Sequence, residues 1–148
     1  MKKYKSDLKR FEIKANKTDF QNTKITSSQN AYDVIKNFYS SDIEVYESFF
    51  ILLLNKANNT IGYAKISQGG IIGTVIDIKI IAKYCIDSLA SNVIFAHNHP
   101  SGNKTPSNED MEITRRTKEA LKILEVSVLD HLILTDTDYY SFADNGAL

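Results

Sequence analysis

The sequence predicts a single α/β or α+β domain made of layers of helices and strands. Its 148 residues are a usual length for one domain, and its hydrophobic content of 43% is enough for a core of that size. Apolar runs of strand length are mixed with segments of helical periodicity, a mixture typical of layered domains. The single cysteine, Cys85, rules out an intramolecular disulfide, so a cytoplasmic location is the simplest expectation.

The strands are predicted from apolar runs bounded by turn-forming residues. The most hydrophobic run covers residues 47–54, and a turn over residues 55–60 joins it to the next strand as a hairpin. Residues 11–26 alternate loosely between apolar and polar side chains and predict one or two edge strands. The other predicted strands cover residues 61–67, 93–96, 126–135 and 139–142.

The helices are predicted from capping residues and apolar spacing. Ser27 or Ser28 caps the first helix, and Asp77 caps the second. In chain order, the predicted helices cover residues 29–39, 77–90 and 105–125. The residues that the second helix is expected to bury are Ile80, Ile81, Tyr84, Cys85 and Leu89.

The charges are unevenly distributed, although the formal net charge is zero. Residues 1–24 carry eight Lys or Arg against three acidic residues, whereas residues 25–148 carry ten against fifteen. We therefore divide the chain into a basic N-terminal arm, residues 1–24, and one domain, residues 25–148. The arm is either a solvated, partly disordered tail or a surface for nucleic acid or an acidic partner. No signal peptide and no membrane-spanning stretch are predicted, since no apolar run is long enough.

The stretch over residues 92–110 holds the side chains that can bind a metal ion. His97 and His99 follow an apolar strand, and side chains two apart in an extended chain share one face. Asp110 falls in the first turn of the third predicted helix. Two imidazoles and a carboxylate that converge in this way make a three-ligand site. Zinc with three protein ligands keeps a fourth position open for water, which is the catalytic arrangement.

The same residues also have structural explanations, and both interpretations remain open at this level. His-x-His pairs often lie on surface loops. Ser107 and Asp110 form the Ser-x-x-Asp pattern of a capping box. Thr105 followed by Pro106 suits the N-cap and first position of a helix.

The spacing resembles the JAMM motif of the MPN (JAB) metalloprotease domain. The sequence fits His-x-His-Pro-x6-Ser-x2-Asp at His97, His99, Pro100, Ser107 and Asp110. The flanking sequence resembles the bacterial RadC-like branch of that family, in residues 97–102, 105–107 and 129–131. The similarity extends from about Glu47 to Gly146. The resemblance implies a three-layer α-β-α sandwich of the cytidine-deaminase-like type, with a mixed sheet.

The resemblance also implies roles for individual residues. His97, His99 and Asp110 would hold one Zn²⁺ per chain. Glu47 would move a proton from the attacking water to the leaving amine, since residues 47–54 fit the family's Glu-x-Phe-x-x-Leu-x-Leu and Glu44 does not. Ser107 would help to stabilise the oxyanion of the tetrahedral intermediate.

The function implied is that of a zinc-dependent metallo-hydrolase, a JAMM-type metallopeptidase or isopeptidase acting on a peptide or isopeptide bond of a protein or peptide substrate. One alternative is a RadC-like factor associated with DNA repair, with nucleic acid contacting the basic arm. The other is a metal-binding interaction module without turnover. The sequence does not indicate an oligomeric state. Deamination is not expected, because the His-x-Glu and Pro-Cys-x-x-Cys patterns of zinc deaminases are missing.

Other polar residues receive structural interpretations. Asp130 and His131 could belong to a triad, but they interrupt an apolar run, where a hydrogen-bonded structural histidine is expected. Asn98 and Ser101 are expected to shape the metal loop or to contact substrate. The glycines within residues 69–73 predict a flexible loop beside the site, since the lysine and spacing of a P-loop are absent.

Overall fold

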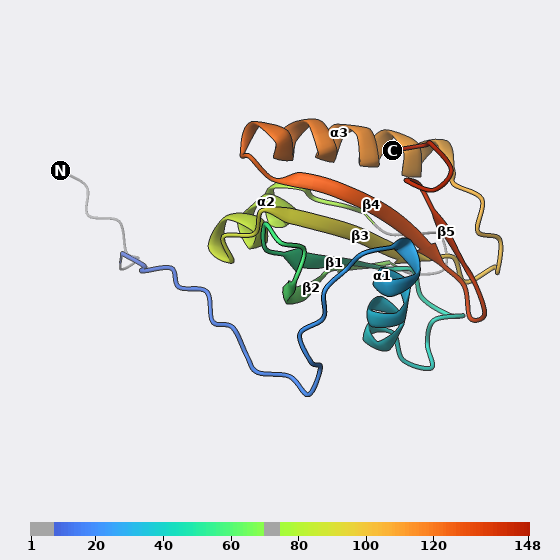
Figure 1. Cartoon of the computed structure of the whole chain (residues 1–148), viewed down its shortest axis with the longest axis horizontal. Coiled ribbons are helices and arrows are strands. Elements are labelled where there is room, and N and C mark those ends of the chain that lie inside the picture. The colour runs from blue at the N-terminus through green and yellow to red at the C-terminus, as the bar shows by residue number, and fades with distance from the viewer. Residues whose placement is uncertain (1–7, 70–74) are drawn as a thin grey trace.

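Five strands form one mixed sheet in the part of the chain that the computed structural model describes, residues 8–69 and 75–148 (Figure 1). The sheet has the order β2-β1-β3-β4-β5. Its strands are β1 (Ser48–Leu54), β2 (Thr60–Gln68), β3 (Asn92–Asn98), β4 (Ser127–Leu134) and β5 (Tyr139–Ser141). β3 and β4 are parallel, and the other neighbouring pairs are antiparallel.

Helices lie on both faces of the sheet (Figure 1). They are α1 (Ser28–Ile35), the short 3₁₀ helix η1 (Lys36–Phe38), α2 (Ile78–Asp87) and α3 (Asn108–Ile123). α2 and α3 pack on one face with the first buried cluster, and α1 packs on the other with the second. The three-layer α-β-α sandwich with a mixed sheet is therefore confirmed. None of the helices in the described residues is long and apolar enough to cross a membrane.

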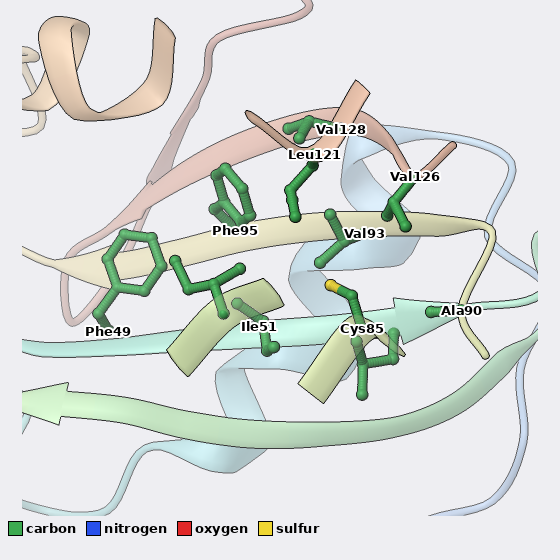
Figure 2. Packing of buried hydrophobic residues seen from close by; sticks show 11 residues of the cluster. Phe49, Ile51, Cys85, Ala90, Val93, Phe95, Leu121, Val126 and Val128 are labelled. Atoms are coloured by element: carbon green, nitrogen blue, oxygen red, sulfur yellow. The ribbon is translucent and has the colours of Figure 1, made fainter. Parts of the chain in front are cut away.

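The central strand β1 is buried along its whole length. Because successive side chains of a strand point to opposite faces, Phe49 and Ile51 pack towards α2 and α3, whereas Leu52 and Leu54 pack towards α1. A strand covered on both faces is apolar at every position, which explains why it stands out in the sequence. Figure 2 shows the cluster on the α2 and α3 face, where side chains from three strands and both helices interlock.

Each α-helix begins at a residue whose side chain accepts a backbone hydrogen bond. Ser27 caps α1 and Asp77 caps α2, as predicted. α3 is capped by Ser107 in a capping box with Asp110, so the prediction that Thr105 is the N-cap is wrong. The Ser-x-x-Asp pair satisfies two backbone donors at once, whereas a cap at Thr105 would leave this reciprocal arrangement unused.

The predicted edge strands over residues 11–26 are not formed. Residues 8–24 are exposed, and the segment meets the sheet at an isolated bridge between Lys24 and Asn59. Phe20 is its main aromatic contact, with its ring beside the rings of Phe38 and Tyr63. A loose alternation of apolar residues makes a strand only where one face is covered, and residues 8–24 stay exposed along their length.

Two residues of α2 that were expected to be buried are exposed. Ile81 and Cys85 face the sheet and are buried, but Ile80 is 39% exposed and Leu89 is 85% exposed. α2 also ends at Asp87, earlier than predicted, which leaves Leu89 in the following turn. Apolar spacing marks the side chains that suit a core, but only packing decides which of them reach it.

Candidate metal centre

Four side chains nominated from the sequence lie together at one end of the central strands. Glu47 directly precedes β1, His97 lies in β3, and His99 follows that strand. Because β1 and β3 are antiparallel, with Phe49 opposite His97, the start of β1 lies beside the end of β3. Asp110 reaches the same place from the first turn of α3. One ligand atom from each of the four lies within 4.8 Å of the others.

The distances within this cluster suit a single metal ion. The Nε2 atoms of His97 and His99 are 2.9 Å apart. The carboxylate of Asp110 places Oδ1 3.2 Å from Nε2 of His97 and Oδ2 3.3 Å from Nε2 of His99. Oε1 of Glu47 is 3.7 Å from Nε2 of His97. Nitrogen and oxygen donors of one tetrahedral ion lie roughly 3.3–3.6 Å from one another, and these separations of 2.9 to 3.7 Å are close enough for small side-chain adjustments to fit such an ion.

The charges of the cluster favour a cation. Burial alone would raise the pKa of Asp110, but hydrogen bonds from His97 and His99 hold this pKa well below its ordinary value. Burial alone would lower the pKa of His99, but hydrogen bonds with Asp110 and with the carbonyl of Asn103 raise it above its usual value. An ionised carboxylate beside imidazoles and a second carboxylate is a site that a metal cation can occupy.

A cavity of about 160 Å³ opens beside the cluster. Its other walls are Phe49, Ile76, Glu109 and Ile113. The side chain of Glu47 is 20% exposed at this cavity, whereas that of His97 is 2% exposed. Glu47, His97 and Asp110 all line the cavity, and Glu47 is the most exposed of the three, so a molecule in the cavity reaches its carboxylate most easily. The glycine loop predicted to lie beside the site includes residues 70–73, which are outside the described residues.

Ser107 lies next to the cluster and has a structural role in this geometry. Its Oγ accepts a hydrogen bond from the backbone N–H of Asp110 at 3.0 Å, and Oδ2 of Asp110 accepts one from the backbone N–H of Ser107 at 2.8 Å. This reciprocal pair fixes the carboxylate of Asp110 against the start of α3. The hydroxyl proton of Ser107 is not used in either bond, so it can be donated to another acceptor.

Asn98 turns away from the cluster and holds the segment that carries Glu47. It is fully buried on the opposite face of β3 from His97. Its Oδ1 accepts a hydrogen bond from the backbone N–H of Ser48 at 2.8 Å. Its Nδ2 donates to the carbonyls of Ile43 at 2.5 Å and Tyr46 at 2.7 Å. Asn98 therefore shapes the site from behind, and of the two roles expected for it, its buried position fits the shaping of the loop.

His131 is the residue whose contact with the cluster the sequence did not reveal. Its ring is completely buried, and Nε2 lies 2.7 Å from Nδ1 of His97. Burial is the main reason that the pKa of His131 is well below its usual value. The carboxylate of Asp130 accepts hydrogen bonds from Ser141 and from the backbone of Ala143, so it is engaged elsewhere. The ring nitrogens of His131 lie instead against His97 and a threonine of α3, which does not make a triad.

The remaining sequence candidates lie outside the cluster. Glu44 is exposed and is not one of the four clustered residues. Ser101 is an exposed loop residue whose Oγ accepts a hydrogen bond from the backbone of Asn103. Cys85 is buried in the core on α2, and burial raises the pKa of its thiol to about 11. A thiol in that state is a packing residue and not a nucleophile.

The fold and the cluster together define a JAB-like domain with a candidate metal site. A mixed sheet between two helical layers carries two histidines and two carboxylates where its central strands meet the start of α3. The chain belongs to the RadC-like JAB domain family, whose model matches residues 25–147. The family resemblance noted in the motif residues is therefore confirmed.

Two similar proteins carry the same description. The chain is 43% identical over 123 residues to a UPF0758 protein of Flavobacterium johnsoniae, which covers 83% of this chain and 53% of that protein. It is 39% identical over 125 residues to a UPF0758 protein of Porphyromonas gingivalis, and this match covers 84% of this chain and 54% of that protein. The chain thus spans about half the length of these curated relatives.

Proposed function

We propose that the protein is a zinc-dependent hydrolase that cleaves a peptide or isopeptide bond. The observation that carries this proposal is the position of Glu47. This carboxylate shares the cluster with His97, His99 and Asp110 and is also a wall of the adjacent cavity. A closed structural site would use all four donors for the metal, whereas a catalytic site needs one group that faces both the ion and the substrate.

His97, His99 and Asp110 would hold the ion. When bound, zinc lowers the pKa of a water molecule towards about 7 and polarises a carbonyl group. Glu47 would take a proton from the attacking water and later give it to the leaving amine. Ser107 would donate its free hydroxyl proton to the oxygen of the carbonyl under attack. Asn98 would keep Glu47 in place throughout, because it holds the backbone on both sides of that residue.

A metal analysis followed by a cleavage screen tests this proposal. Protein reconstituted with zinc and then desalted should contain about one ion per chain, and His97→Ala or His99→Ala should lose it. The zinc form should cleave members of a library of peptides and branched isopeptides, and a chelator should abolish the cleavage until zinc is restored. Absence of bound metal would refute the site, and bound metal without turnover would favour an interaction module.

The second candidate function is a factor associated with DNA, and the basic arm favours it. Residues 1–24 carry five more positive than negative charges, eight against three, in front of an acidic domain. The described part of this arm, residues 8–24, is exposed and runs away from the sheet (Figure 1). Exposed lysines and arginines can contact phosphates without any change in the domain.

A further inference from the structure

His131 is a buried imidazole that the proposed reaction does not use, although it touches a proposed metal ligand. It lies in β4 opposite Phe95 of β3, so its side chain faces α3 on the same side of the sheet as His97. Its two ring nitrogens make different contacts. Nε2 lies 2.7 Å from Nδ1 of His97, and Nδ1 lies 2.6 Å from Oγ1 of Thr114.

The direction of these hydrogen bonds is set by the backbone carbonyl of Asp110. Oγ1 of Thr114 lies 2.6 Å from this oxygen, four residues back along α3. A carbonyl can only accept, so Thr114 must donate its single hydroxyl proton to Asp110. Towards His131 the same hydroxyl oxygen can only accept. Nδ1 of His131 therefore carries a hydrogen and donates it to Thr114.

The surroundings of the His131 ring decide the state of its other nitrogen. The rings of Phe49, Phe95 and Phe142 pack around it, with centroids 5.5, 5.8 and 4.7 Å away. A charged imidazolium in this apolar setting would be costly, so the ring is neutral with its hydrogen on Nδ1. Its Nε2 then has only a lone pair and accepts a hydrogen bond from Nδ1–H of His97. In the neutral form of His97 the lone pair is then on Nε2, the atom that faces His99 and Asp110.

We propose that Thr114 and His131 are positioning residues that fix His97 in the tautomer able to bind a metal ion. The hydrogen-bond chain runs from the carbonyl of Asp110 through Thr114 and His131 to His97, so the backbone of one ligand sets the tautomer of another. His99 reaches the same tautomer by a shorter route, because its Nδ1 donates to the carbonyl of Asn103 at 2.6 Å. This inference rests on the proposed metal site, but it does not require hydrolysis. Outer partners that orient ligating histidines typically contribute 10- to 100-fold in metal affinity.

Imidazole ¹⁵N spectra of the metal-free wild type test the chain without any substitution. We expect the His131 signals of a neutral ring with its hydrogen on Nδ1 and a bare Nε2. A hydrogen on Nε2 of His131 would overturn the proposal, since Nδ1 of His97 could then not donate to it. Because this measurement uses no metal, it gives its answer even if the protein proves not to bind zinc.

Zinc affinities measured by chelator competition test the role of Thr114. Thr114→Val keeps the shape of the side chain and removes the hydroxyl, and we expect affinity to fall by about 10- to 100-fold. Thr114→Ser should restore the wild-type value. The matched control is Thr117→Val on the same helix, because Thr117 is equally buried and its Oγ1 finds no hydrogen-bond partner among the described residues. Equal affinity losses in the two valine variants would overturn the proposal.

A double-mutant cycle tests whether Thr114 and His131 act as one chain. His131→Phe keeps an aromatic ring in the core and removes the acceptor for His97. We expect it to weaken zinc binding about as much as Thr114→Val, and we expect the double variant to lose little more, because either change breaks the same chain. If the losses of zinc affinity in the two single variants added fully in the double variant, the two residues would act separately, and the hydrogen-bond chain would be refuted. Circular dichroism spectra identical to wild type are required of each variant.

Discussion

The side-chain amide of Asn98 fixes the backbone of Ser48 from the face of the sheet opposite the histidines, at an Oδ1 to N–H distance of 2.8 Å. Glu47 is the residue directly before Ser48, so the proposed proton carrier is positioned by a residue that never touches the cluster. Asn98 lies between His97 and His99 in the sequence. The end of β3 and the residue that follows it therefore supply metal donors on one face and the anchor of Glu47 on the other.

Asn98→Asp should destabilise the fold. The carboxylate can still accept from Ser48, but it cannot donate to the part-buried carbonyls of Ile43 and Tyr46, and it would place a negative charge beside both of them. We expect a loss of about 3 kcal/mol or more in the free energy of unfolding, measured by urea denaturation. The control is Asn37→Asp, which removes two donations to the carbonyls of Asp33 and Val34 at an exposed position. A loss no larger than in this control would contradict the anchoring role.

Glu47→Gln should separate metal binding from turnover. The substitution keeps the size of the side chain and removes its basic carboxylate, so zinc content should stay near that of the wild type. Turnover of a substrate found in the cleavage screen should fall by about 10²- to 10⁴-fold, mainly in kcat. Glu44→Gln is the control, because Glu44 is exposed and lies outside the cluster. If both variants kept full turnover, the proton would have to be carried by another group.

Ser107→Ala should have two effects that can be separated. Loss of the helix cap should cost about 1 kcal/mol in the free energy of unfolding. Loss of the hydroxyl donor should lower kcat by about 10²- to 10³-fold. Ser27→Ala removes the corresponding cap of α1, where Oγ accepts from the backbone of Asn30 at 3.1 Å, far from the cluster. It should therefore reproduce the stability loss at unchanged kcat. Equal kcat values in the two variants would leave Ser107 with only its capping role.

The contact between His99 and Asp110 should make the stability of the metal-free protein depend on pH. The lowered pKa of Asp110 gives a contribution that is present above its ordinary pKa of 3.8 and is lost as the pH falls through the lowered value. The raised pKa of His99 gives a contribution that is present below its ordinary pKa of 6.5 and is lost as the pH rises through the raised value. Stabilisation by this pair should be greatest between roughly pH 4 and 6.5.

Urea unfolding of the metal-free protein between pH 3 and 9 measures this dependence. We expect the free energy of unfolding of the wild type to exceed that of Asp110→Asn most clearly between roughly pH 4 and 6.5, and by less at alkaline pH. If the free energies of unfolding of the two proteins differed by the same amount at every pH, the pair would contribute no proton-linked stability.

Neutralising the basic arm should separate the two candidate functions. Replacing the lysines and arginine of residues 1–17 by glutamine leaves Phe20 in contact with Phe38 and Tyr63. Zinc content should therefore be unchanged. If the arm binds DNA, the substitution should weaken binding and reduce its dependence on salt concentration. Salt-independent or absent DNA binding by the wild type at low ionic strength would remove the DNA-associated function for this chain.

The sequence by itself determined the features that depend on near neighbours along the chain. Asp77 was identifiable as a cap, and the cap of α1 was narrowed to Ser27 or Ser28, because a cap bonds to the helix it begins, two or three residues away. The continuous apolar run over residues 47–54 identified the strand β1, and the structure then showed that both of its faces are covered. The spacing of His97, His99 and Asp110 was informative because the periods of a strand and of a helix fix which side chains share a face.

The tertiary structure alone decided which of these local features meet. Ile80 was misassigned because packing, not apolar spacing, sets the side of α2 that faces the sheet, and Leu89 was misassigned because α2 ends at Asp87. His131 joins His97 across 34 residues only because β3 and β4 pair side by side, and Thr114 joins both only because α3 lies over that pair. No local rule relates positions so far apart, since their distance is set by how strands and helices pack and not by the period of any one element.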